Sequence, residues 1–129
     1  WNYLQDMTED IGALTRLARL ELQSNQLTRL PNGFSALTNL VTVDLSSNLL
    51  CDVTALPNLA QTKQLRLHHN QLASLPSHFG KSFASLQGLY MQHNFLTRLV
   101  DNFSCPLMER IFLSFNRLRS LPLSLCNSP

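Results

Sequence analysis

One asparagine recurs at a nearly constant interval along the chain, and this interval constrains the fold more than any other feature. The six residues lie 22 to 24 positions apart: Asn2, Asn25, Asn48, Asn70, Asn94 and Asn116. Apolar residues recur at fixed distances around them, as in Leu17, Leu20, Leu22, Leu27 and Leu30 around Asn25. A period of this length predicts a stack of equivalent repeats in which each repeat contacts only its neighbours.

The segment just before each asparagine alternates apolar, polar and apolar residues, which is the period of a strand with one buried face. These segments predict strands at residues 20–22, 43–45, 65–67, 89–91 and 111–113. Because each segment returns in the same direction one repeat later, we expect the strands to pair in parallel, with crossovers on one side.

The pattern L-x-x-L-x-L-x-x-N-x-L resembles the leucine-rich repeat family, and the resemblance covers essentially the whole chain. It implies an α/β solenoid that is curved, with about five short parallel strands on the concave face and loop or short-helix return limbs on the convex face. The stretch Thr8-Glu9-Asp10-Ile11-Gly12 is similar to the L-P-x-x-I-G-x-L limb of intracellular scaffold and regulatory proteins of this family, although Met7-Thr8 replaces Leu-Pro.

We expect one leucine-rich repeat domain over residues 1–129, with a partial repeat at 1–16 followed by the repeats around Asn25 to Asn116. The repeat register is already in progress at Trp1 and is unfinished at Pro129. Solenoids normally close their core with polar or disulfide-bonded caps, and neither terminus has this character. The sequence therefore favours a chain with both ends uncapped, either an excerpt of a longer protein or a chain whose ends are covered by partners.

The composition excludes several classes of partner. A formal net charge of +2 is too small to favour nucleic acid or an anionic membrane surface, and polar residues interrupt every leucine cluster, so we expect no membrane span. Cys51, Cys105 and Cys126 are odd in number and widely spaced, which favours a cytoplasmic location. The alternative is an extracellular location, where the sequon at Asn102, Phe103 and Ser104 would matter.

The repeated asparagines themselves are predicted to be structural. A buried amide is tolerated only when it is hydrogen-bonded, most simply to main-chain groups of adjacent turns. We therefore expect a hydrogen-bonded ladder along the axis, formed by Asn25, Asn48, Asn70, Asn94 and Asn116.

The outward positions of the strands are predicted to select the partner, because the inward positions are committed to packing. The middle position reads Glu21, Asp44, Arg66, Tyr90 and Phe112 along the axis, so an Asp44–Arg66 pair and adjacent Tyr90 and Phe112 rings are expected. Exposed aromatics beside arginine are typical of interaction hot spots, and Gly88 is expected to leave a pocket beside Tyr90. The candidate protein-binding residues are Arg66, His68, Tyr90, Gln92, Arg110, Phe112 and Phe115. The alternative is that these rings cover neighbouring backbone or pack on a further repeat.

No catalytic, cofactor-binding or metal-binding residues are predicted. His69 and His93 are expected to stack, but no carboxylate or cysteine on their columns completes a ligand set. The four glycines contain no phosphate-binding loop, and the cysteines lie away from the histidine columns, so none has a base in reach.

These features together predict a non-catalytic protein-interaction scaffold that binds a partner on the concave strand face, as part of a multi-subunit assembly. Three alternatives remain open: a regulatory or targeting subunit for a phosphatase or GTPase, an extracellular recognition domain whose caps have been removed, and the targeting arm of an enzyme located elsewhere in the parent chain.

Overall fold

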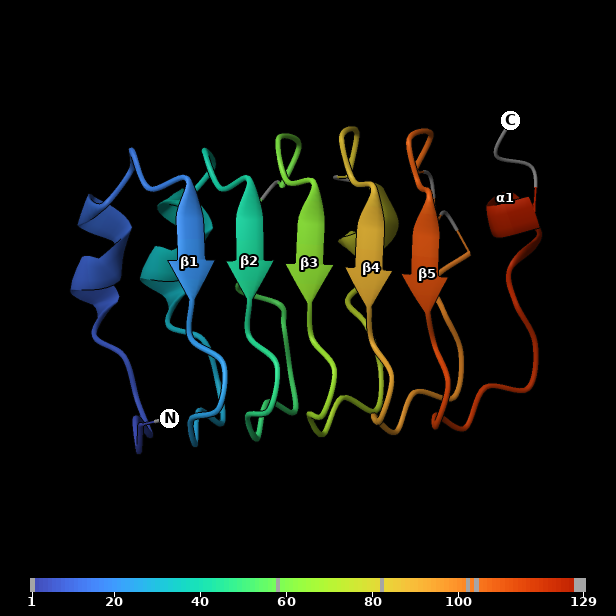
Figure 1. Ribbon diagram of the computed structural model, residues 1–129, viewed down its shortest axis with the longest axis horizontal. Coiled ribbons are helices and arrows are strands. Elements are labelled where there is room, and N and C mark those ends of the chain that lie inside the picture. Colours follow the sequence, from blue (N-terminus) through green and yellow to red (C-terminus); the bar gives the residue numbers. More distant parts are fainter. Residues whose placement is uncertain (1, 58, 82, 102, 104, 127–129) are drawn as a thin grey trace.

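A computed structural model places five parallel strands side by side in one sheet, in the order in which they occur along the chain (Figure 1). It describes all residues except 1, 58, 82, 102, 104 and 127–129. The strands are β1 (Arg19–Glu21), β2 (Thr42–Asp44), β3 (Gln64–Arg66), β4 (Gly88–Tyr90) and β5 (Arg110–Phe112). Each strand is followed by a return limb behind the sheet, so the molecule is the curved solenoid that the repeat predicts.

The strands begin and end one residue earlier than the sequence pattern predicts, although the inward and outward faces are as expected. The central residues Leu20, Val43, Leu65, Leu89 and Ile111 pair with one another across the sheet. Main-chain pairing also continues beyond the strand ends, since the N–H of Leu22 donates to the carbonyl of Asp44 at 2.8 Å. The shift therefore concerns where a short strand is taken to end and not which side chains face the core.

A single elongated core runs between the sheet and the return limbs. Leucines of successive turns occupy equivalent buried positions, and Leu27, Leu50, Leu72 and Leu96 are each 0% exposed. Thr62 is the one polar residue in the apolar frame of the five complete repeats, and it is also fully buried. Its hydroxyl donates to the carbonyl of Leu40 at 2.6 Å, which removes the penalty of an unpaired hydroxyl in the core.

The return limbs contain short helical turns: three 3₁₀ helices, η1 (Glu9–Ala13), η2 (Asn32–Ala36) and η3 (Phe79–Lys81), and the α-helical turn α1 (Leu123–Cys126). None of the helices in the described part of the chain is long and apolar enough to cross a membrane. Figure 1 shows η1 and η2 next to each other behind the first turns of the sheet. A Cβ atom at Gly12 would lie 2.7 Å from the Gly33 carbonyl oxygen, and one at Gly33 would overlap the Glu9 carbonyl oxygen, so this approach requires glycine.

Phenylalanines form an apolar layer in the return limbs, with Phe34, Phe79 and Phe103 buried. The repeat spacing predicts a stack between Phe79 and Phe103. Phe79 instead packs edge to face against Phe83, with ring centroids 4.9 Å apart. The closest aromatic neighbour of Phe79 among the described rings is therefore supplied by its own limb, four residues along the chain.

The repeated asparagines connect each turn to the one before it. The side-chain oxygen of Asn70 accepts the N–H of Leu50 at 3.0 Å, and its amide donates to the carbonyls of Leu45 and Leu67, each at 3.0 Å. Asn48, Asn94 and Asn116 make the same kinds of contact one repeat away. The ladder satisfies main-chain groups that the short strands leave unpaired.

Candidate functional site

The concave face is built from columns of side chains that run along the solenoid axis. The strand register aligns the outward residues Glu21, Asp44, Arg66, Tyr90 and Phe112, here called the middle column. Arg66 and Asp44 form an ion pair with 3.7 Å between nitrogen and oxygen. Asp44 also accepts the hydroxyl of Ser46 at 2.6 Å, so the carboxylate is held in place.

The second half of the middle column is aromatic. The rings of Tyr90 and Phe112 stack with centroids 5.0 Å apart and planes 14° from parallel. The guanidinium of Arg66 lies over the Tyr90 ring, 5.4 Å from its centroid, which is within the range of a cation–π contact. Phe112 is nevertheless 43% exposed. The strand register thus presents a flat aromatic surface that is anchored on one side by Arg66.

A second column, here called the ridge, consists of the residue before each asparagine: Ser24, Ser47, His69, His93 and Phe115. Each has a positive φ of 53° to 56°. This left-handed conformation costs an L-residue about 1 to 2 kcal/mol. The apolar pattern carries no information on φ, so sequence reasoning did not find this conformation, although the column is defined by the asparagine register.

The ridge carries its own aromatic stack beside the middle column. The His69 and His93 rings lie 4.2 Å apart, the His93 and Phe115 rings lie 4.3 Å apart, and both pairs are within 9° of parallel. Phe115 is 73% exposed. A large apolar side chain therefore occupies a strained and solvent-facing position, where its only described aromatic contact is His93.

His68 and Gln92 lie between the middle column and the ridge, and both are half-buried. Nδ1 of His68 and Oε1 of Gln92 are buried without a hydrogen-bond partner among the described residues. Burial lowers the pKa of His68 below its usual 6.5, against the nearby Asp44 carboxylate, which acts to raise it. Neutral imidazole is therefore favoured, and this part of the face is not optimised for stability.

The pocket expected beside Tyr90 is not present, because neighbouring side chains fill the space above Gly88. A Cβ atom at Gly88 would lie 2.5 Å from Oε1 of Gln64 and 3.0 Å from Cε2 of Tyr90. Gly88 is therefore buried, and it permits this packing instead of opening a cavity. Arg110, at the equivalent position of β5, is exposed and pairs with Glu109 at 3.6 Å.

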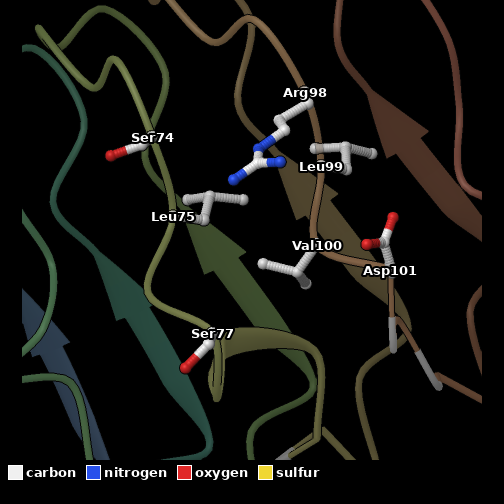
Figure 2. Close-up of a pocket in the computed structure, with 7 residues that line it drawn as sticks. All are labelled: Ser74, Leu75, Ser77, Arg98, Leu99, Val100 and Asp101. Carbon is white, nitrogen blue, oxygen red and sulfur yellow. The ribbon is translucent and has the colours of Figure 1, made fainter.

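A groove that sequence reasoning did not find lies between the return limbs that follow Asn70 and Asn94. It has a volume of about 220 Å³ and is lined by Ser74, Leu75, Ser77, Arg98, Leu99, Val100 and Asp101 (Figure 2). Figure 2 shows the Arg98 guanidinium directed across the groove toward Leu75. The lining residues come from two limbs whose relative positions depend on limb length, which the leucine frame does not specify.

The described residues offer no catalytic or metal-binding arrangement. They contain no group of three or more His, Cys, Asp or Glu side chains placed to hold a metal ion. Cys51 is exposed, whereas Cys105 is buried and burial raises the pKa of its thiol to about 11. A thiol with this pKa is almost entirely protonated at neutral pH and is a poor nucleophile. The sequon residues Asn102 and Ser104 lie outside the described residues, as does the side chain of Cys126.

Comparisons with known proteins find similarity along most of the chain. A family model described as "Leucine Rich repeats (2 copies)" matches residues 15–58. The chain is 36% identical over 114 residues to leucine-rich repeat serine/threonine-protein kinase 1 of Mus musculus, a match that covers 84% of the chain and 6% of the kinase. It is 34% identical over 118 residues to lumican of Gallus gallus, covering 87% of the chain and 34% of lumican.

A solved structure of an internalin, InlF, from Listeria monocytogenes has a similar fold. It superposes with a TM-score of 0.78 at 23% sequence identity, over 92% of this chain and 34% of the internalin chain. The chain thus spans about a third or less of each of these three proteins.

Proposed function

Because the chain belongs to the leucine-rich repeat family, we propose that it is a non-catalytic protein-interaction scaffold that binds a protein partner on its concave face, as one part of a larger assembly. The observation that carries this proposal is the stack of Tyr90 on Phe112, which leaves an aromatic surface open to solvent. The proposed contact residues are Arg66, His68, Tyr90, Gln92, Arg110, Phe112 and Phe115.

The energetics of the concave face support protein binding. Phe112 and Phe115 keep 43% and 73% of their surface in water, and burying apolar surface contributes about 25 cal/mol per Å². Stacking already restricts the Tyr90, Phe112 and Phe115 rings, so a partner would lose little side-chain entropy in ordering them. Large preorganised rings beside arginine are the composition of an energetic hot spot.

Removal of the central stack tests the proposal. The double variant Tyr90→Ala with Phe112→Ala is expected to weaken capture of a partner by about 2 kcal/mol or more, because it removes two aromatic anchors. The partner is first identified by affinity capture from the native source, and its affinity for each variant is then measured by calorimetry.

A matched control removes apolar surface elsewhere. Tyr3 and Leu14 are 85% and 51% exposed and lie outside the aromatic part of the concave face, so the double variant Tyr3→Ala with Leu14→Ala should bind normally. Circular dichroism verifies that both variants are folded. Full-strength binding by the Tyr90 and Phe112 variant, or an equal loss in the control, would contradict the proposal.

A second candidate function is that of a targeting segment in a chain that carries an enzyme elsewhere. The similarity to a protein described as a serine/threonine-protein kinase favours it, since the chain corresponds to only 6% of that protein. The full open reading frame distinguishes the two candidates: a catalytic domain in the parent chain supports this one, and further repeats alone support the scaffold.

The proposed location is cytoplasmic. The thiols of Cys51 and Cys105 are both free, and an exposed free thiol such as Cys51 is typical of a reducing compartment. Fractionation of cells that express the full-length protein should place it in the cytosol, with Asn102 unmodified. A mass shift on treatment with an N-glycosidase would contradict this location.

A further inference from the structure

Charge is distributed unevenly along the solenoid. Residues 1–62 contain six of the eight acids and three of the ten cationic residues, whereas residues 63–129 contain two acids and seven cationic residues. The small net charge of the whole chain therefore conceals an acidic first half and a basic second half. The exposed aromatic rings of the concave face all belong to the basic half.

These rings form one neighbourhood, here called the aromatic patch: Tyr90, His93, Phe95, Phe112 and Phe115. Arginines border it on several sides. Arg66 lies over Tyr90, the guanidinium of Arg117 lies 4.9 Å from the centroid of Phe95, and Arg110 precedes Phe112 by two residues on β5.

The acids near the aromatic patch are already paired. Asp44 is bound to Arg66 and Glu109 is bound to Arg110. Arg117 forms no ion pair among the described residues, and its guanidinium is held against Phe95 instead. The border of the patch therefore presents positive charge that the protein itself does not neutralise, around a flat apolar centre.

We propose that the aromatic patch binds an extended acidic segment of the partner, in which an aromatic or aliphatic side chain covers the Tyr90–Phe112 and His93–Phe115 stacks and flanking carboxylates meet Arg110 and Arg117. This inference rests on the proposed function and adds the chemistry of the partner. The ridge stack is about as long as three residues of extended chain. A basic segment would be repelled by the same border.

Selection from a library of random dodecapeptides tests the inference. The library is displayed on phage and selected on the immobilised chain, and the Tyr90→Ala with Phe112→Ala variant serves as the counter-target. Peptides that bind the unaltered chain and not the counter-target are expected to be enriched in Asp and Glu around an aromatic or aliphatic residue.

Charge reversals of a selected peptide's binding site then locate the carboxylates. By fluorescence anisotropy, Arg110→Glu and Arg117→Glu should each weaken binding by about three- to tenfold, because attraction becomes repulsion at the border. Arg16→Glu changes the net charge by the same amount in the turn before β1 and should leave the affinity nearly unaltered.

Each outcome supports or overturns a distinct statement. Peptides that require Tyr90 and Phe112 but are neutral or basic would overturn the acidic partner and leave concave-face binding intact. Equal weakening by Arg16→Glu would show that only bulk charge matters, which also overturns the inference. Selection of no peptide overturns it as well, and peptides that bind without Tyr90 and Phe112 overturn both the inference and the proposed function.

Discussion

Replacement of Asn70 by leucine isolates the energetic role of the asparagine ladder. Asn70 is 5% exposed, and its side-chain oxygen is the only described acceptor for the N–H of Leu50. The carbonyls of Leu45 and Leu67 also lose the Asn70 amide, but they keep the amides of Asn48 and Asn94.

The loss of stability follows from this inventory. One buried N–H without a partner costs about 1 to 3 kcal/mol, and the two weakened carbonyls add about 1 kcal/mol together, so Asn70→Leu should lower the free energy of unfolding by about 2 to 4 kcal/mol. Equilibrium unfolding in urea, followed by far-ultraviolet circular dichroism, measures the change from the shift in midpoint.

Asn25→Leu is the matched control. Asn25 occupies the same place in its repeat and accepts the N–H of Leu4 at 3.1 Å, but this contact is exposed. Water can replace the lost hydrogen bond, so the expected loss is below about 1 kcal/mol. Equal losses in the two variants, or an unaltered midpoint for Asn70→Leu, would refute the assignment of the effect to buried main-chain groups.

Two further predictions concern the packing of the limbs and the charge state of the concave face. Gly33→Ala should destabilise the protein by about 1 to 3 kcal/mol in the same urea assay, because the added methyl group would overlap the Glu9 carbonyl oxygen; an unaltered midpoint would contradict the contact between η1 and η2. The lowered pKa of His68 means that the unfolded chain binds a proton more readily than the folded chain, so stability should be full above pH 6.5 and fall as the pH drops below this value. His68→Asn should remove this part of the pH dependence, and an identical pH profile for the variant would show that other groups cause it.

The fold follows from the sequence because the asparagine register specifies which residues are equivalent in successive turns. Parallel pairing then aligns Asp44 with Arg66 and Tyr90 with Phe112, so that the ion pair of the first two residues and the ring stack of the other two follow from the repeat spacing alone. Both contacts depend only on lateral neighbours within a sheet, where spacing is nearly constant.

Other parts of the site depend on conformations that the pattern does not contain. The space above Gly88 is closed by the side-chain conformations of Gln64 and Tyr90, which residue type alone leaves open. The positive φ of Phe115 is a property of the main-chain turn before the asparagine, and the groove at Arg98 depends on how neighbouring limbs differ in length. Sequence reasoning located the binding face by its columns but not its detailed relief.

A nuclear magnetic resonance titration of the isotopically labelled chain with a bound partner segment tests the central claim most directly, because it reports contact residue by residue. Concave-face binding predicts that the largest chemical-shift changes cluster on β3, β4 and β5 and on the ridge, around Arg66, Tyr90, Phe112 and Phe115. Changes concentrated instead on the return limbs, around the groove of Ser74, Arg98 and Asp101, would contradict concave-face binding and move the site to the opposite side of the solenoid.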